Sequence, residues 1–283
     1  MTARGDVFVS VAELSQRLEA GDPTTILDIR WQLGAPDGRD DHAARHLPGA
    51  VYVSLEDELS DHRVTGRGRH PLPSGHSLEM AARRWGVRAG VPVVVYDDWN
   101  RAGSARAWWV LRAAGIADVH ILGGGLAAWR AAGGALETGG VTPPPGDVIV
   151  DHDDLYAGAM PTLTADEAAE HANLLDARAP ERFRGDVEPV DPVAGHIPGA
   201  KNLPSTAVLA ADGTLLSEDA LAALAWSFGG TEQVGVYCGS GVTAAVAVAA
   251  LAAAGVDAAL FPGSWSQWVS ESGRPVASGE HSS

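Results

Sequence analysis

The sequence predicts an α/β protein that consists of two tandem domains of one fold, each with a mainly parallel sheet flanked by helices. Residues 27–30 (Leu-Asp-Ile-Arg) return as residues 175–178 (Leu-Asp-Ala-Arg), 148 positions later (175 minus 27). Residues 46–50 (His-Leu-Pro-Gly-Ala) return as residues 196–200 (His-Ile-Pro-Gly-Ala), 150 positions later (196 minus 46). A period as long as a whole domain indicates duplicated domains, because solenoid repeats are much shorter.

The first copy shows helices and strands in alternation. Ser10 and Glu13 match a capping box that opens a helix. Apolar periodicity and turn residues then predict strands at 24–29, 51–54, 91–96 and 118–122, and helices around 78–85, 104–114 and 126–132. Such alternation is typical of a parallel sheet covered on both faces, and ligands bind such sheets beyond the carboxyl ends of the strands.

The second copy repeats this order after a linker. A helix is expected to begin at residues 164–167, and strands are expected at 173–176, 233–237 and 258–261. The run Thr-Pro-Pro-Pro-Gly and the acidic run Asp-His-Asp-Asp that follows it favour a solvated linker over a metal site. We therefore predict a first domain at residues 1–142, a linker at 143–160 and a second domain at 161–283.

The composition is that of a globular chain, with 46% apolar residues, 20% charged residues and a net charge of -16. This charge argues against nucleic acid and anionic membranes as partners. The longest apolar stretch, residues 242–256, is shorter than the ~20 residues that a membrane-spanning helix needs. A single cysteine permits no internal disulfide, and residues 1–10 lack the pattern of a signal peptide, so we expect a cytoplasmic location.

Cys238 is the only cysteine, and it stands between a predicted strand and an Ala-rich predicted helix. Backbone N–H groups and the helix dipole at such a junction stabilise an anion and favour a reactive thiolate. Gly239 and Gly241 let the chain wrap closely around the sulfur. A lone cysteine is more often a small buried hydrophobic residue, but the two glycines favour a nucleophile here.

The duplication restricts this chemistry to one copy. Aligning Tyr96 with Tyr237 puts Asp97 where the second copy has Cys238. The first domain is therefore predicted to be catalytically silent, to cover the site and to lend side chains across the cleft between the domains.

On these residues the chain resembles the tandem rhodanese sulfurtransferases. The resemblance rests on the repeated Asp-x-Arg and His-x-Pro-Gly-Ala motifs, the cysteine loop and residues 263–268 (Gly-Ser-Trp-Ser-Gln-Trp), and it spans nearly the whole chain. It implies two rhodanese-like domains, of which the first is silent. The loop Cys-Gly-Ser-Gly-Val-Thr at 238–243 is similar to that of 3-mercaptopyruvate sulfurtransferases, whereas members that prefer thiosulfate usually carry Cys-Arg-Lys-Gly-Val-Thr.

The resemblance implies a double displacement that needs no metal or organic cofactor. The Cys238 thiolate takes sulfur from a small anionic donor, and the persulfide passes it to cyanide or to a thiol, a thioredoxin-like protein being one candidate acceptor. These donors and acceptors are the expected partners, with no nucleic acid and no membrane. The loop residues expected to hold the substrate or the persulfide are Gly239, Ser240, Gly241, Val242 and Thr243.

Further roles follow from the resemblance. Arg182 stands at the family's substrate-binding arginine. His70 and Glu56 stand at the positions of a histidine and an acid, usually Asp, that are proposed to form a relay with the loop serine, Ser240, and to help protonate the leaving enolate. Each residue has a structural alternative: a surface salt bridge for Arg182, packing beside a proline for His70, and a solvated acidic stretch for Glu56.

One position departs from the family's pattern. Mercaptopyruvate enzymes usually have a second arginine nine residues after the first, and here that position is Asp191. A carboxylate there is expected to repel an anionic donor. The donor therefore stays open between 3-mercaptopyruvate, which the loop favours, and thiosulfate.

Other classes of protein match the sequence less well. A Cys-dependent phosphatase needs an arginine six residues after the cysteine, where Ala244 stands, and a serine hydrolase built on Ser240 would need a Gly-x-Ser-x-Gly elbow. A persulfide carrier or binding module without turnover remains as the non-enzymatic alternative.

Overall fold

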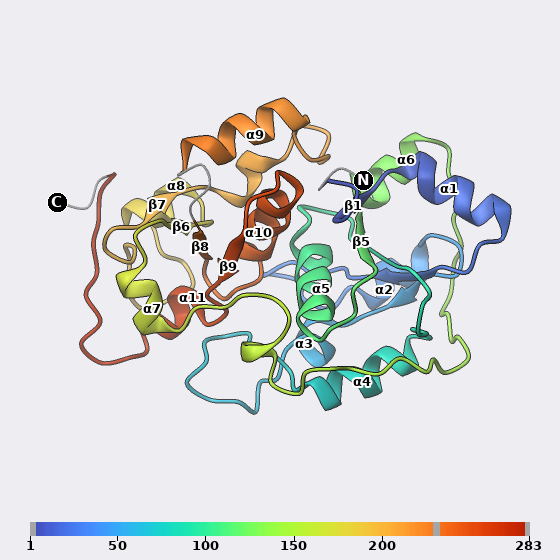
Figure 1. The fold of residues 1–283 in the computed structure, drawn as a ribbon, viewed down its shortest axis with the longest axis horizontal. Helices are drawn as coiled ribbons and strands as arrows, with labels where there is room; N and C mark the ends of the chain where they lie inside the picture. The colour runs from blue at the N-terminus through green and yellow to red at the C-terminus, as the bar shows by residue number, and fades with distance from the viewer. Residues whose placement is uncertain (1–3, 229–232, 281–283) are drawn as a thin grey trace.

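The computed structural model describes residues 4–228 and 233–280, and it contains two parallel sheets flanked by helices (Figure 1). The second sheet has the strand order β7-β6-β8-β9, and the first repeats this order as β3-β2-β4-β5, with β1 added at its edge. All pairs of neighbouring strands are parallel. The predicted α/β fold class with two copies of one sheet is confirmed.

The elements of the first copy precede those of the second along the chain. The first sheet consists of β1 (Phe8–Val9), β2 (Thr25–Asp28), β3 (Val51–Tyr52), β4 (Val93–Tyr96) and β5 (Val119–Leu122). Its helices are α1 (Val11–Ala20), α2 (Arg39–Ala44), α3 (Leu55–Glu58), α4 (Gly75–Arg84), α5 (Ala102–Ala113) and α6 (Gly125–Ala131). The second sheet consists of β6 (Leu174–Asp176), β7 (Lys201–Asn202), β8 (Val234–Tyr237) and β9 (Ala258–Leu260). Its helices are α7 (Ala165–Glu170), α8 (Pro180–Arg184), α9 (Glu218–Ser227), α10 (Ala244–Ala253) and α11 (Ser264–Trp268), with 3-10 turns η1 (Leu155–Ala157) and η2 (Ser205–Val208).

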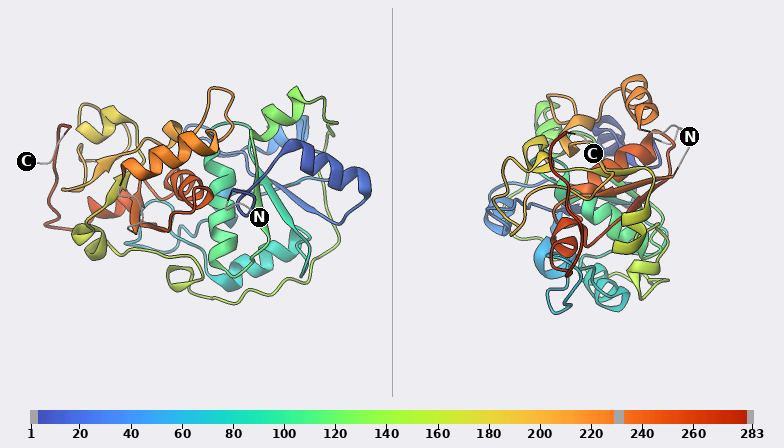
Figure 2. Two further views of the ribbon diagram at one scale, coloured as in Figure 1. Left: turned by 45° about the horizontal axis from the view of Figure 1, so that its top comes forward. Right: turned by 90° about the vertical axis from the view of Figure 1, so that its left-hand side faces the viewer.

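Helices α5 and α10 pack against each other where the two copies meet (Figures 1 and 2). Nearly every residue of both helices is buried. A helix that is apolar on all sides must be covered on all sides, and here each helix lies between its own sheet and the other helix. One hydrophobic core runs from Trp108 and Trp109 of α5 to Val246 and Leu251 of α10. The helices that follow β4 and β8 therefore form much of the interface between the two copies.

The two repeated Asp-x-Arg motifs form buried ion pairs. Arg30 binds Asp28 at 3.0 Å, and Arg178 binds Asp176 at 2.6 Å. Arg178 also donates to the carbonyl oxygen of Gly195, just before the second His-x-Pro-Gly-Ala motif. These pairs tie the end of a strand to the loop that follows it in each copy, which is the structural role that the repeat indicates.

The segment between the copies lies along the first one. Gly146 donates to the carbonyl oxygen of Arg83 at 2.7 Å, and Asp151 donates to that of Ala114 at 3.0 Å. Asp153 accepts a hydrogen bond from the backbone N–H of His76 at 2.9 Å, so the acidic run binds the start of α4. Among the described residues, no group of histidine, cysteine and carboxylate side chains could hold a metal ion, and no helix has the length and apolar character to cross a membrane.

Candidate active site

Cys238 follows the last residue of β8 and begins the loop that leads into α10. The residue is buried, and the backbone N–H of Gly241 donates to its Sγ at 3.2 Å. Gly241 has a φ of +77°, and a Cβ there would lie 2.3 Å from the carbonyl oxygen of Pro262. Only glycine therefore lets the loop fold back onto the sulfur. Val242 and Thr243 complete the turn into α10, where Ala245 and Val246 donate to their carbonyl oxygens.

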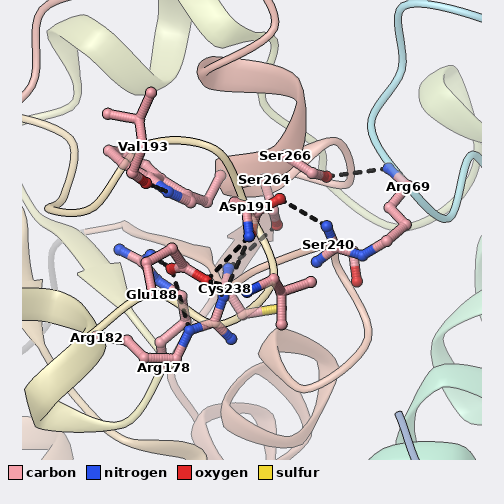
Figure 3. Close-up of polar contacts among 12 residues, drawn as sticks. Arg69, Arg178, Arg182, Glu188, Asp191, Val193, Cys238, Ser240, Ser264 and Ser266 are labelled. Atoms are coloured by element: carbon pink, nitrogen blue, oxygen red, sulfur yellow. Dashed lines mark hydrogen bonds and ion pairs between the residues drawn. The ribbon is translucent and has the colours of Figure 1, made fainter. Parts of the chain in front are cut away.

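The start of α11 anchors the cysteine loop from the other side (Figure 3). The Cys238 N–H donates to Ser264 Oγ at 3.1 Å, and the Trp265 N–H donates to the Cys238 carbonyl oxygen at 3.0 Å. Ser266 donates its N–H to the Gly239 carbonyl oxygen at 2.9 Å. Ser264 adopts a φ of +52°, which is uncommon for a residue with a side chain. The Gly-Ser-Trp motif thus fixes the backbone on which the sulfur stands.

Two arginines, one from each copy, lie over Gly239. A Cβ on Gly239 would lie 3.3 Å from Arg69 Nη2 and 3.6 Å from Arg182 Nη1. Arg69 belongs to the first copy, and its backbone N–H donates to Ser266 Oγ at 3.0 Å. Arg182 lies on α8 of the second copy. Together they place two positive charges beside the loop, where an anionic substrate could accept charge-assisted hydrogen bonds.

Asp191 joins these two arginines (Figure 3). Its Oδ1 lies 2.6 Å from Arg69 Nη1, and its Oδ2 lies 3.3 Å from Arg182 Nη2. Glu188 makes two more hydrogen bonds with Arg182, at 2.6 Å and 3.1 Å. Burial alone would raise the pKa of Glu188, but the hydrogen bonds that it accepts, first of all from Arg182, lower it. The Asp191 carboxylate is therefore paired with both guanidinium groups of this cluster.

A second group of side chains reaches the cysteine loop from the first copy. His70 Nδ1 lies 2.7 Å from Ser240 Oγ, and His70 Nε2 lies 3.1 Å from Glu56 Oε1. The Trp31 Nε1–H also donates to Glu56 Oε1, at 2.6 Å. Glu56 lies in the first turn of α3. The structure thus brings Ser240, His70 and Glu56 into one chain of hydrogen bonds with the geometry of a serine, histidine and acid triad.

The charges of this chain follow from its hydrogen bonds and burial. The hydrogen bond from His70 is the main cause that lowers the pKa of Glu56 to about 2, although burial acts in the opposite direction. Burial lowers the pKa of His70 from its ordinary value, and Glu56 opposes this shift. At neutral pH, Glu56 is therefore ionised and His70 neutral. Because an ionised carboxylate can only accept, the proton of the neutral His70 ring is assigned to Nε2, which donates to Glu56. His70 Nδ1 then accepts a hydrogen bond from the Ser240 hydroxyl.

Arg106 is a buried residue of this site to which no motif of the sequence points. It lies in the middle of α5, fully buried, and burial lowers its pKa to about 10, so it keeps its charge at neutral pH. Its hydrogen bonds go to backbone carbonyl oxygens, those of His70 at 3.0 Å, Leu59 at 3.1 Å and Gly241 at 3.4 Å. Arg106 therefore connects the relay to the cysteine loop and places a positive charge beneath both.

Arg69 is a second residue of the site that was not predicted from the sequence. The sequence does carry one indication of a role for it, because Arg69 stands next to His70 in the run Arg-Gly-Arg-His at 67–70. For Arg106 the signal is a charge that stands directly before the apolar run Ala-Trp-Trp-Val-Leu at 107–111. Neither signal alone separates a functional arginine from a surface one, because the partners come from distant parts of the chain.

The corresponding loop of the first copy holds a carboxylate in place of the sulfur. Asp97 follows β4 as Cys238 follows β8, and it is buried. Its carboxylate accepts from the backbone N–H groups of Trp99 at 3.2 Å, Arg101 at 3.3 Å and Ser104 at 3.0 Å, and from the Ser104 hydroxyl at 2.6 Å. Arg101 also pairs with it at 3.0 Å. The donors of this loop are thus used by the protein's own side chain.

Comparison with protein families shows two matches to the rhodanese-like domain, at residues 10–132 and 162–271. The chain is 66% identical, over 99% of each chain, to the protein named "Putative thiosulfate sulfurtransferase SseB" of Mycobacterium tuberculosis. It is 43% identical to the "Probable 3-mercaptopyruvate sulfurtransferase" of Pseudomonas aeruginosa, over 96% of this chain and 98% of that one. Among solved structures, the 3-mercaptopyruvate sulfurtransferase from Leishmania major matches with a TM-score of 0.82 and 30% identity, over 94% of this chain and 75% of that one.

Proposed function

The chain belongs to the rhodanese family and is a sulfurtransferase, and from this premise we propose that 3-mercaptopyruvate is its donor and Cys238 its nucleophile. One observation carries the choice of donor: a chain of hydrogen bonds from Ser240 through His70 to Glu56 ends on the cysteine loop itself. Such a relay is useful when the leaving group needs a proton. Pyruvate enolate needs one, whereas the sulfite that leaves from thiosulfate departs as a dianion.

The first half-reaction loads the sulfur. The Cys238 thiolate attacks the sulfur of the donor, an S–S bond forms, and the C–S bond breaks with its electron pair staying on pyruvate as an enolate. The thiol proton of the donor moves to Ser240 Oγ while the Ser240 proton moves to His70 Nδ1. The imidazolium, paired with Glu56, then returns a proton through Ser240 to the enolate, and pyruvate leaves. The persulfide stays as an anion on Cys238.

The loop and the arginines supply the electrostatic part of this step. The Gly241 N–H donates to Sγ, and Arg106 places its charge beneath the loop, so both stabilise negative charge on the sulfur. Arg69 and Arg182 flank Gly239 and are placed to bind the donor carboxylate. Asp191, whose charge in the sequence predicts repulsion of an anion, is paired with the same two arginines. The donor must therefore compete with Asp191 for them.

The second half-reaction unloads the sulfur. Cyanide, or a thiol such as that of a thioredoxin-like protein, attacks the outer sulfur of the persulfide and regenerates the Cys238 thiolate.

We also propose a role for each part of the chain. The predicted first domain (1–142) is the silent partner, and the predicted linker (143–160) connects it to the catalytic second domain (161–283). We further propose that the location is cytoplasmic. The location is supported by the single free cysteine, which no disulfide uses.

A specific observation keeps thiosulfate as the second candidate donor. The relative with 66% identity carries thiosulfate in its name, and Arg69 and Arg182 could bind a sulfonate oxygen as well as a carboxylate.

Steady-state kinetics with both donors separates these candidates. The wild type is expected to have the higher kcat/KM with 3-mercaptopyruvate. Ser240→Ala should slow turnover of this donor by about 10- to 100-fold, the low end of general acid catalysis, and should slow thiosulfate turnover far less. A higher kcat/KM for thiosulfate, with Ser240→Ala equal on both donors, would assign the chain to thiosulfate.

A further inference from the structure

The relay does not end at Glu56. Glu56 Oε1 is used by His70 and Trp31, and Glu56 Oε2 lies 2.9 Å from His62 Nε2. The two imidazole rings are 5.9 Å apart between centroids. One carboxylate thus bridges a buried histidine and a second histidine on the loop after α3. Neither the resemblance to the family nor the motifs of the sequence assigned a role to His62.

The two histidines differ in their access to water. The His70 side chain is 3% exposed, whereas the His62 side chain is 49% exposed. His62 lines a surface cavity of about 490 Å³. Charged and polar side chains of α3, α4 and the loop between them share this cavity, among them Asp57, Asp61, Arg63, His76 and Arg84. The far end of the relay therefore lies in solvent, while its near end lies under the cysteine loop.

The proposed reaction leaves a proton to be removed. When mercaptopyruvate is the donor and cyanide the acceptor, the thiol proton of the donor ends on pyruvate, so the relay returns to its starting state. When the acceptor is a thiol, its own S–H proton must also be removed. Because a persulfide is a stronger acid than the thiol from which it forms, the product leaves as an anion and the acceptor's proton stays on the relay as a His70 imidazolium. The next turnover begins only after this proton has left a buried site.

We propose that His62 is the solvent-side end of the relay, a positioning residue that holds Glu56 and passes the acceptor's proton from His70 to water in the cavity. This inference rests on the proposed function. His70 Nε2 gives its proton to Glu56, the carboxyl group makes a half-turn that exchanges its two oxygens, and His62 takes the proton at Nε2. His62 can adopt the accepting tautomer because its exposed ring exchanges protons with water. It then releases a proton from Nδ1, and no bond between heavy atoms changes.

A steady-state comparison of two acceptors on the full chain tests this path, because the proton must leave before each new turnover. The enzyme turns over 3-mercaptopyruvate with saturating 2-mercaptoethanol or with saturating cyanide at pH 7. The expected result for His62→Ala is a loss of about tenfold in kcat with the thiol, below the full range of acid–base catalysis, and a kcat with cyanide equal to that of the wild type. Equal kcat values with the thiol in wild type and variant would overturn the inference.

Three further arms separate proton transfer from structural support. His62→Gln, which still donates to Glu56 but takes up no proton, should be as slow as His62→Ala; a rate like that of the wild type would overturn the inference. Imidazole should restore the rate of His62→Ala, and a loss that imidazole does not restore would make His62 a structural support only. His76→Ala is the matched control, since His76 lines the same cavity from α4. An equal loss of rate in His76→Ala would also overturn the inference.

A different result would refute the proposed function itself: a wild type that forms no persulfide on treatment with 3-mercaptopyruvate.

Discussion

The loops after β4 and β8 have the same place in the two sheets, yet one surrounds a carboxylate and the other a sulfur. Asp97 is held by three backbone N–H groups, a hydroxyl and Arg101. Cys238 is met by the N–H of Gly241, and two arginines lie over the next residue of its loop, Gly239. Both loops therefore direct backbone N–H groups at the side chain that follows a strand. In the first loop that side chain is a carboxylate held by hydrogen bonds within the loop, and we propose that this loop is inert for that reason.

We propose that the first domain still takes part in the chemistry. Arg69, His70, Glu56 and Arg106 all come from the first half of the chain, and each reaches the cysteine loop or the relay. In the proposed mechanism the duplication separates two tasks: one copy carries the nucleophile, and the other supplies charge and proton transfer. The following variants test this division, in order of decreasing effect.

Exchanging the residues that distinguish the two loops should have the largest effect. Cys238→Ser is expected to lower turnover with either donor by on the order of 10³-fold or more, because a hydroxyl cannot carry the transferred sulfur. Adding Asp97→Cys to this variant should restore nothing, since the first loop lacks a relay and the paired arginines. Activity recovered by Asp97→Cys would show that the loop alone is sufficient, and circular dichroism would check that both variants fold.

The next effect concerns binding across the two copies. Arg182→Ala and Arg69→Ala should each raise KM for mercaptopyruvate by about tenfold and change kcat little, because a charge-assisted hydrogen bond to a retained anionic group contributes equally to ground state and transition state. Steady-state kinetics measures both constants. If KM rises for Arg182→Ala only, the first domain does not help to bind the donor.

Asp191→Asn should have a smaller effect in the opposite direction. The amide keeps the shape of the side chain but removes the charge that competes with the donor for Arg69 and Arg182, so KM should fall by roughly threefold. A higher KM would instead mean that Asp191 holds the arginines in their binding position.

The smallest effect is on stability in acid. The folded-state pKa of Glu56 is about 2, below its ordinary value of 4.5. Its contribution to stability is therefore complete above about pH 4.5 and is lost as the pH falls toward 2. Glu56→Gln lacks this contribution. Urea unfolding at several pH values should show the difference in unfolding free energy between wild type and variant shrinking over that range, and a constant difference would contradict the assigned pKa.

Some of this architecture could be predicted from the sequence, because its signals are local. The capping boxes of Ser10 with Glu13 and of Thr164 with Glu167 are both present. The predicted helix 104–114 is α5 (Ala102–Ala113), and the predicted strand 233–237 is β8 (Val234–Tyr237). Elements such as β1 (Phe8–Val9) and α3 (Leu55–Glu58) were missed, since two to four residues are too few to show a hydrophobic period.

The site was predictable only in part, for a related reason. The cysteine loop is one short segment, and the resemblance places Ser240, His70, Glu56 and Arg182, which the structure brings to that loop or to the relay. Arg69 and Arg106 depend on contacts between the two copies, and a pattern along the chain does not encode such contacts. Asp191 shows the same limit: its charge suggested repulsion, but the two arginines around it could not be seen in the sequence.

Intact mass spectrometry after brief treatment with 3-mercaptopyruvate tests the central claim most directly. The account predicts that the wild type gains the mass of one sulfur atom, that peptide mapping places it on Cys238, and that cyanide removes it. Cys238→Ser should gain nothing under the same conditions. A wild type that turns over donor while Cys238 stays unmodified, or a sulfur that is found elsewhere in the chain, would contradict the account.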